Sequence, residues 1–546
     1  MHTHPVRRQP IIGIACLLII GTGAGLRAGA SLALPLAIAC AVAALAVAAY
    51  GAWRSGLRGG IAVAATVCCA GFLSGFLSEW TRRDERAWLA AHATEPVQVR
   101  GVVDSDAFTP YRPPGATRRV ISLRRVVIEH AGGVRPLTQT PVRVTCYGRD
   151  LLPKVGETWS FPTPLSKLRT RPKPTHLPVN TRPGDAVLLE PPAFWDWRPL
   201  ADRARASAVR RLSLGIESWP TVPTLIHAML LGLRSDIPPE MNTIFRNSGT
   251  MHVFAISGQG IGLVAAVLAA GLSFLAFPRT RWGLTLIPLL FGYTLLTGAS
   301  SSAMRACLMA AFYFGAPLVR RKPDLSAALA AAAIIQIAWD PRDLLSIGFL
   351  LSYTVMAGLV LLCPPLSRLF RALLRVESAA TQAALLRLSE RLTQQRQRFA
   401  RQAWAVRLAL WRHATLGFFA DLLAMGVAAW VASAPLIAYF FERFIPGGLL
   451  ANLVVVPAAG LIVVAGALAI LTSFLFPSIA GIFNCAAAFC TAVMVEASRL
   501  TTLIPGASVI VPPPSLALIV VWYAAMLAAA WMLHTAGQAE KAEHPF

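Results

Sequence analysis

The chain has 546 residues, of which 55% are hydrophobic and only 14% are charged, and its mean hydropathy is +0.58. Water-soluble globular proteins carry about 25% charged residues, so the composition excludes that class and predicts an integral membrane protein. Lysine and arginine outnumber the acidic residues 50 to 26, which gives a net charge of +24. Because charges are costly inside hydrocarbon, we expect the excess in extramembrane parts, where it suits nucleic-acid phosphates and anionic lipid headgroups equally.

Three apolar segments open the chain, and each is long enough to cross the roughly 30 Å of hydrocarbon in a bilayer. They cover residues 11–26, 31–53 and 60–79 and predict an N-terminal group of transmembrane helices within residues 1–80. Because two further spans follow it, the first segment is interpreted as a membrane anchor and not as a cleaved signal peptide.

Residues 90–195 break this pattern and are predicted to form a small soluble β domain. Short runs in which apolar and polar residues alternate are typical of strands. Five such runs occur, at 97–104, 118–129, 141–148, 156–161 and 184–190. About five strands suit a small barrel of the OB type, although other small β folds have the same count. The arginine-rich segment that follows, 196–220, predicts an amphipathic helix that lies on the membrane surface.

The remainder, residues 222–535, is predicted to be a second transmembrane domain. Nine spans are expected, at 252–277, 281–298, 301–319, 324–340, 344–363, 416–440, 449–474, 478–504 and 514–534. The fold class is therefore a polytopic α-helical membrane protein with about twelve transmembrane helices and an inserted OB-like β domain. Arginine and lysine in the short loops place both termini in the cytoplasm and the β domain outside it.

The basic segment 364–415 has a helical, amphipathic pattern and is expected on the cytoplasmic side. Two interpretations remain open for it. It is either a solvated helical pair that enforces the topology, or a surface that contacts lipid or nucleic-acid phosphates.

The stretch NSGTMHVFAISGQGIGL, residues 247–263, combines polar side chains with glycines at the start of an apolar span. In one interpretation Asn247 or Ser248 caps a helix that begins near Thr250, and the GxxxG spacing at 258–262 forms a packing face. In the other, a break in the helix lets its polar side chains line a cavity.

Polar residues also interrupt three later spans. Arg305 lies inside an apolar helix, where it either snorkels to an interface or faces a polar lumen suited to phosphate. Ser352 lies in the middle of a span that begins after an aspartate-proline turn. Asn452 and Pro457 together predict a kinked or discontinuous helix.

Two other charged features are interpreted as structural. Glu496 and Arg499 are three residues apart and are expected to pair on one helix face. Asp421 is expected at the end of a helix. Cysteine and histidine residues are scattered without the spacing of a metal site, so neither a metal nor a cofactor is predicted.

Taken together, these stretches resemble the competence domain of the ComEC family, bacterial membrane proteins implicated in taking transforming DNA across the cytoplasmic membrane. The matching motifs, in chain order, are LLGLRSDIPPEMNTIFRNSGTMH (230–252), HVFAISG (252–258), TGASSSAMRA (297–306), DPRDLLSIGFLLSY (340–353) and APLIAYFFERFIPGGLLANLVVVP (434–457). The family also has N-terminal helices followed by an OB-like domain. It usually has a second histidine where this chain has Gly260, and many members continue into a metallo-β-lactamase-like domain whose HxHxDH motif is not found in this chain.

The resemblance implies a channel in the bacterial cytoplasmic (inner) membrane that takes up single-stranded DNA, with no enzymatic activity of its own. We predict as pathway or gate residues His252, Ser257, Gln259, Arg305, Ser352 and Asn452, and as DNA-binding residues of the β domain Arg100, Arg118, Arg119, Arg124, Arg125 and Arg143. Expected partners are single-stranded DNA and membrane lipids, and a separate nuclease, a cytoplasmic motor and a homo-oligomer are left open. The alternatives are a transporter of a small anionic or lipid-linked solute and a membrane scaffold whose β domain binds protein.

Overall fold

A computed structural model describes most of the chain. The described residues are 10–28, 60–92, 96–105, 118–138, 142–147, 153–164, 177–181, 186–192, 196–254, 258–374 and 400–543. The expected span at 31–53 lies outside them. The chain divides into two compact units, each discontinuous in sequence. The first comprises Met1–Pro238, Phe254–Ser346 and Ile462–Phe489, and the second comprises Pro239–Val253, Ile347–Leu461 and Cys490–Phe546.

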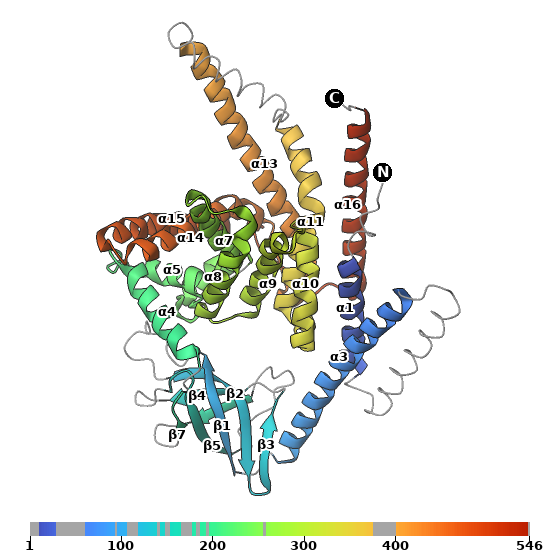
Figure 1. Cartoon of the computed structure of the whole chain (residues 1–546), viewed down its shortest axis with the longest axis vertical. Coiled ribbons are helices and arrows are strands. Elements are labelled where there is room, and N and C mark those ends of the chain that lie inside the picture. Colours follow the sequence, from blue (N-terminus) through green and yellow to red (C-terminus); the bar gives the residue numbers. More distant parts are fainter. Residues whose placement is uncertain are drawn as a thin grey trace. The chain divides into compact units, whose positions relative to one another are not determined.

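The β domain belongs to the first unit and is a seven-stranded sheet (Figure 1). Its strands are β1 (Pro96–Ser105), β2 (Arg118–His130), β3 (Gly133–Leu137), β4 (Val142–Tyr147), β5 (Thr158–Pro164), β6 (Leu177–Thr181) and β7 (Val187–Glu190). The order is β6-β4-β2-β1-β5-β7, with β3 paired to β2, and every pair is antiparallel except β4 with β6. The prediction of about five strands missed β3 and β6, because each has only five residues and contains a proline, which weakens the alternating pattern.

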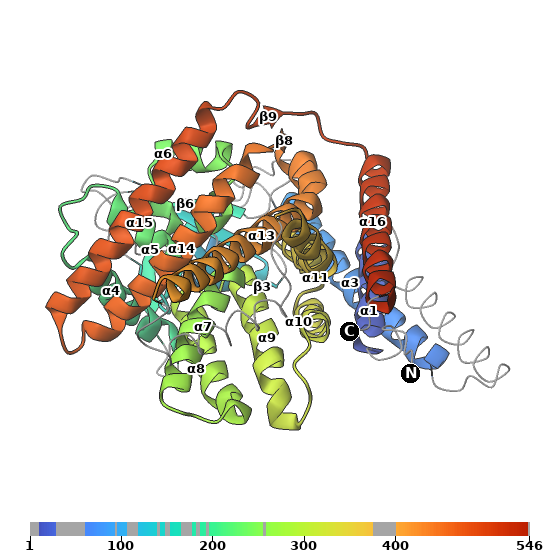
Figure 2. The same cartoon turned by 90° about the horizontal axis from the view of Figure 1, so that it is seen from above.

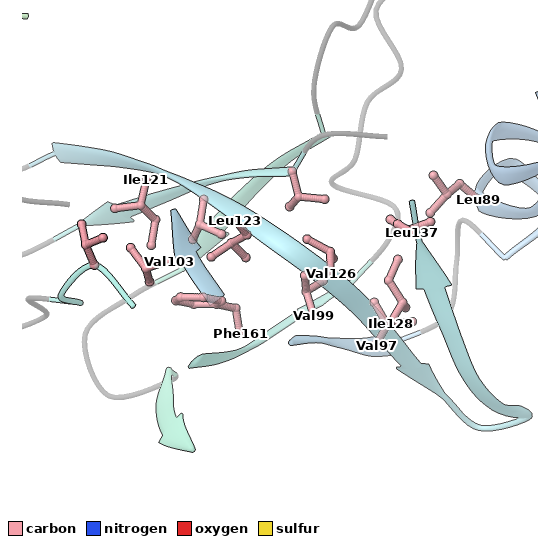
Figure 3. Close-up of a cluster of buried hydrophobic side chains, with 13 residues drawn as sticks. Leu89, Val97, Val99, Val103, Ile121, Leu123, Val126, Ile128, Leu137 and Phe161 are labelled. Atoms are coloured by element: carbon pink, nitrogen blue, oxygen red, sulfur yellow. The ribbon is translucent and has the colours of Figure 1, made fainter. Parts of the chain in front are cut away.

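One face of this sheet forms an apolar core. Alternate residues of β1 and β2 point into it, among them Val97, Val99, Ile121 and Leu123, as the period-two pattern predicts (Figure 3). Leu89 of helix α3 (Gly60–Ala91) joins the same cluster and lies beside Leu137 of β3 in Figure 3. The end of this long helix is therefore packed into the β domain.

Helix α3 also packs against α1 (Pro10–Ala28) through glycines on both helices. A Cβ placed on Gly21 would overlap the carbonyl oxygen of Cys68, and one on Gly25 would overlap that of Phe72. Gly71 and Gly75 also lie close to α1, since a Cβ on them would be 2.8 Å and 2.5 Å from backbone carbonyl oxygens of that helix. Such a small-xxx-small pattern lets two backbones approach closely and is typical of helix pairs in membranes.

Further helices of the first unit follow the β domain. They are α4 (Arg198–Ser213), α5 (Val222–Leu231), α7 (Gly258–Phe274), α8 (Trp282–Leu296), α9 (Ser301–Gly315) and α10 (Leu325–Trp339). Helices α7, α8 and α9 pack side by side in Figure 2 around a core that includes Ile261, Leu286, Leu290 and Cys307. The packing face predicted at 258–262 is not found among the described residues, since a Cβ on Gly262 would meet nothing within 4 Å.

The second unit begins with α6 (Pro239–Asn247) and the 3₁₀ turn η4 (Met251–Phe254), whose last residue belongs to the first unit. Its long helices include α11 (Ile347–Leu373), α13 (Ala400–Phe441) and α16 (Leu516–Glu543), and α11 lies along α13 (Figure 1). The short strands β8 (Arg443–Phe444) and β9 (Val509–Ile510) pair antiparallel (Figure 2). Helices α14 (Gly447–Thr472) and α15 (Pro477–Leu503) each contribute residues to both units.

Six helices in the described part of the chain are long and apolar enough to cross a membrane. They are Ser301–Val319, Ile347–Leu373, Trp411–Phe441, Gly447–Thr472, Pro477–Leu503 and Leu516–Leu533. Each coincides with one of the expected spans, so the multi-pass membrane class is confirmed. Other apolar helices, such as α7 and α10, are shorter, and the total of twelve spans stays a prediction.

Helix α14 continues through Pro457 without interruption, so of the two predicted forms the discontinuous helix is contradicted, whereas a kink stays a prediction. One expectation about a charged residue was wrong. Asp421 lies within α13 and not at its end, because α13 begins at Ala400 and extends the expected span by more than four turns. Asp421 there accepts hydrogen bonds from Ser367 and Arg371 of α11. The expected pair of Glu496 and Arg499 is present, at 4.0 Å.

Candidate pathway residues and nucleic-acid interface

The stretch 247–252 ends one helix and does not cap another. Helix α6 stops at Asn247, and Gly249 follows with a φ of +75°. The N–H of Thr250 donates to the carbonyl of Phe245 at 2.9 Å, and that of Gly249 donates to Arg246 at 3.3 Å. These two bonds form a Schellman motif, in which a glycine with positive φ terminates a helix. The predicted N-cap role of Asn247 or Ser248 was therefore wrong.

Three buried hydroxyl groups form a hydrogen-bonded row that links this turn to helix α15. The Ser248 hydroxyl lies 2.7 Å from that of Thr250, which lies 3.1 Å from the Ser498 hydroxyl of α15. All three side chains are fully buried. Each hydroxyl can both donate and accept, so the chain satisfies groups that would otherwise be costly to bury. We call these three residues and the adjacent pair Asn247 and Arg443 the polar junction.

Arg443 of β8 closes the polar junction on its other side. Its Nη1 donates to the Asn247 side-chain oxygen at 2.9 Å and to the Ser508 hydroxyl at 3.3 Å. The N–H of Gly447, the first residue of α14, donates to the carbonyl of Ala507 at 3.0 Å. Two of the quoted motifs, 230–252 and 434–457, therefore meet here, although nearly two hundred residues of sequence separate them.

His252 lies just beyond the polar junction, in η4, and its side chain is exposed. Its Nδ1 is 3.1 Å from the carbonyl oxygen of Gly249, so this nitrogen carries the proton and donates. The outer nitrogen, Nε2, makes no hydrogen bond with a described residue. His252 can therefore present a hydrogen-bonding group away from the turn that holds it.

Ser352 and Asn452 occupy other helices of the same unit. Ser352 is half-buried in α11, and Asn452 is half-buried in the second turn of α14. The side-chain oxygen of Asn452 is buried and has no hydrogen-bond partner among the described residues. None of His252, Ser352 and Asn452 bonds to another, so the structure does not join them into one hydrogen-bonded site.

The other predicted pathway residues belong to the first unit. Ser257 lies outside the described residues, and Gln259 is the second residue of α7, with only its backbone described. Arg305 in α9 is only 1% exposed and is the largest fully buried side chain of the described chain. Its Nη1 donates to the Ser301 hydroxyl at 3.3 Å. The guanidinium is held inside the protein, which argues against snorkelling to an interface.

In the β domain, some of the predicted DNA-binding arginines already form ion pairs with acidic side chains, and others do not. Arg124 lies 2.7 Å from the Asp196 carboxylate and 3.7 Å from that of Asp104. Arg198, at the start of α4, pairs with the same two aspartates, at 3.5 Å and 3.1 Å. Burial, followed by the neighbouring Arg198, lowers the pKa of the Arg124 guanidinium. Arg124 therefore acts as a link between the sheet and α4, which argues against a phosphate contact.

The remaining arginines of the β domain stay candidates for phosphate. Arg125 is exposed, has a φ of +49° and forms no ion pair with a described residue. Arg100 pairs with Glu129 at 2.9 Å on the surface, where such a pair is weak and exchangeable. In the backbone register, Arg118 is opposite Tyr147, Arg119 is opposite Cys146 and Arg143 is opposite Ser122.

Sequence reasoning missed Asn484, which fixes the end of α4 in the first unit. Asn484 of α15 is fully buried, and its side-chain amide donates to the carbonyls of Arg211 and Leu214, both at 2.9 Å. The sequence signal was a single amide side chain within the apolar run GIFNCAAAFC, and this pattern does not indicate which groups the amide binds.

Among the described residues, no group of three histidine, cysteine or acidic side chains could hold a metal ion.

Comparison with known proteins supports one family. The model of the family described as "Competence protein" matches residues 229–536, which include the polar junction and Arg305. The chain is 30% identical over 142 residues to ComE operon protein 3 of Bacillus subtilis (strain 168), covering 26% of this chain and 18% of that protein. It is 31% identical over 200 residues to the uncharacterized protein YcaI of Escherichia coli (strain K12), covering 34% of this chain and 24% of that protein.

Each of these relatives is therefore matched over less than a quarter of its own length. No solved structure matches the chain. The family model covers more than half of the chain, in the region where the quoted motifs lie. The chain is accordingly a multi-pass membrane protein that belongs to the Competence protein family, the ComEC family.

Proposed function

We propose that this protein carries single-stranded transforming DNA across the bacterial cytoplasmic membrane. The observation that carries the proposal is the Competence family match over residues 229–536, which contains every pathway residue named above. ComE operon protein 3 of Bacillus subtilis is among the relatives matched. Both termini are proposed to be cytoplasmic and the β domain to lie outside.

A buried cation supports a path for phosphate through the first unit. Arg305 is 1% exposed within the apolar helix α9, and an ionisable side chain inside an apolar membrane segment is typically functional. Its planar guanidinium has five N–H donors and matches the geometry of phosphate oxygens. We propose that Arg305 contacts the DNA backbone during passage, and that His252 and Asn452 line the path in the second unit.

The β domain is proposed to be OB-like and to receive DNA before passage. The strand order β6-β4-β2-β1-β5, with β4 and β6 parallel, supports this assignment. OB folds bind single strands by combining a basic groove with aromatic stacking. Arg125 supplies an exposed charge, and Arg100, Arg118, Arg119 and Arg143 are proposed to add to it.

The test separates surface binding of DNA from its internalisation. Cells that lack the gene receive wild-type protein, Arg305→Ala, Arg305→Lys, His252→Ala or Arg281→Ala. Labelled duplex DNA measures binding and nuclease-resistant uptake, and a selectable marker measures arrival in the cytoplasm. Arg281→Ala is the matched control, because this arginine is exposed at the start of α8 and forms no ion pair with a described residue.

Under the proposal, the deletion abolishes marker transfer and leaves surface binding intact. Arg305→Ala lowers transfer at least about tenfold, since a charged contact contributes about 1.5–3 kcal/mol, and Arg305→Lys retains part of it. Arg281→Ala behaves as wild type. Unchanged transfer in both Arg305→Ala and His252→Ala, at normal protein levels, would remove the proposed path. Full transfer in the deletion strain would leave the small-solute transporter and the scaffold as the alternatives.

A further inference from the structure

Two neighbouring arginines line a small hollow on helix α4. The hollow has a volume of about 210 Å³ and is lined by Ser207, Arg210, Arg211 and Leu214. The spacing of these four residues puts them on one face of the helix. Arg210 is exposed and forms no hydrogen bond or ion pair with any described residue. Two adjacent cations with no acidic group lining the hollow are suited to an anionic ligand.

Arg211 is already held in position. Its Nη1 donates to the Ser473 hydroxyl at 2.8 Å, and its Nε donates to the Ser207 hydroxyl at 3.3 Å. The centre of its guanidinium lies 3.8 Å from the centroid of the Phe474 ring. These contacts fix the plane of the guanidinium and leave Nη2 available to donate to a ligand.

The helix end that carries the arginines is fixed as well. The buried amide of Asn484 donates to the carbonyls of Arg211 and Leu214, both at 2.9 Å. These carbonyls would otherwise lack partners at the C-terminal end of α4. The hollow is therefore largely preformed, which reduces the entropy lost on binding.

Three exposed apolar residues, Phe474, Leu475 and Phe476, lie next to the hollow, and we call them the apolar tip. The turn between α14 and α15 exposes Phe474 by 67%, Leu475 by 77% and Phe476 by 58%. In a membrane protein, exposed apolar side chains of this size are expected to face lipid. Arg211 lies over the first of them, and a cation above an aromatic side chain is typical of the membrane–water interface.

We propose that this hollow binds the phosphate of an anionic phospholipid, with the acyl chains along the apolar tip. Arg210 and Nη2 of Arg211 would donate to the phosphate oxygens, the arrangement in which arginine binds phosphate most strongly. The apolar tip favours an amphiphile over DNA or free phosphate, because only an amphiphile uses both parts of the surface. This site is separate from the proposed DNA path and does not depend on it.

The test uses the full-length protein purified in a neutral detergent. Binding of short-chain phosphatidylglycerol and of phosphatidylcholine with the same chains is measured by native mass spectrometry and by the shift in thermal unfolding. The variants are Arg210→Gln, Arg211→Gln and Arg203→Gln. Arg203 is the matched control, because it is exposed on the same helix but does not line the hollow.

The wild type and Arg203→Gln should bind phosphatidylglycerol in preference to phosphatidylcholine. Arg210→Gln should weaken phosphatidylglycerol binding by about tenfold, because it removes a charged hydrogen bond to the ligand. Arg210 is exposed and forms no hydrogen bond or ion pair with a described residue, so its variant should fold even if Arg211→Gln, which loses the Ser473 contact, does not. Equal binding of both lipids, or equal loss in Arg203→Gln, would overturn the proposal. Displacement of the lipid by an equimolar oligonucleotide or by inorganic phosphate would overturn it too.

Discussion

The guanidinium of Arg443 donates a hydrogen bond of 2.9 Å to the side-chain oxygen of Asn247. This contact joins the end of α6 to the short strand before α14. A hydrogen bond to a charged group contributes about 1.5–3 kcal/mol, so Arg443→Ala should destabilise the detergent-solubilised protein by that amount. Because both residues share one bond, the double variant with Asn247→Ala should cost less than the sum of the single changes.

The measurement is chemical unfolding of the four proteins of this double-mutant cycle. Arg246→Ala is the control, since Arg246 is adjacent, exposed and forms no side-chain hydrogen bond or ion pair with a described residue. Strict additivity of Asn247→Ala and Arg443→Ala would show that the bond contributes nothing to stability.

Gly249 should be intolerant of any side chain. Its φ of +75° is unfavourable for other residues, and an added Cβ would lie 3.1 Å from Cγ2 of Ile445. We expect Gly249→Ala to lower stability by about 1–2 kcal/mol. Gly260→Ala is the control, because its Cβ would meet nothing within 4 Å and alanine favours a helix. A Gly249→Ala protein as stable as Gly260→Ala would contradict the helix-terminating role.

The contact between α1 and α3 predicts that a valine substitution is tolerated at one glycine of α1 and disrupts the helix pair at another. A side chain at Gly25 would overlap the backbone of Phe72, whereas a Cβ at Gly23 would lie 3.7 Å from Cδ2 of Leu344. Gly25→Val should separate the helices and raise protease sensitivity in this region, and Gly23→Val should not. Overpacking of this kind typically costs about 1–3 kcal/mol. Similar proteolysis rates in the two variants would refute the close approach.

In the β domain, two adjacent arginines should affect different properties, Arg124 the stability of the domain and Arg125 its binding of single-stranded DNA. Arg124→Ala removes the 2.7 Å pair with Asp196 and should lower stability by about 1 kcal/mol, the upper value for a partly exposed pair. It should change single-strand binding little. Arg125→Ala should leave stability unchanged and reduce the salt dependence of binding by about one charge. Fluorescence anisotropy with a labelled single-stranded oligonucleotide measures the binding constant across a series of salt concentrations. If the slope of log binding constant against log salt concentration were the same for Arg125→Ala as for the wild type, Arg125 would be excluded from the interface.

The sequence alone determined the membrane class, the position of the β domain and most helix locations, because hydropathy and the period of two depend only on local residue order. It also indicated the family, through motifs such as HVFAISG and TGASSSAMRA. The strands missed were the short ones that contain proline, and α13 began earlier than expected because its first turns are polar.

The tertiary structure decided which polar residues have partners. Arg124 and Arg125 are neighbours in sequence, yet one is held between two aspartates and the other is exposed. Asn247 follows the pattern of a helix cap, but it ends a helix and accepts a bond from Arg443. A local pattern cannot specify such pairings, because each depends on a partner brought near by the packing of distant segments.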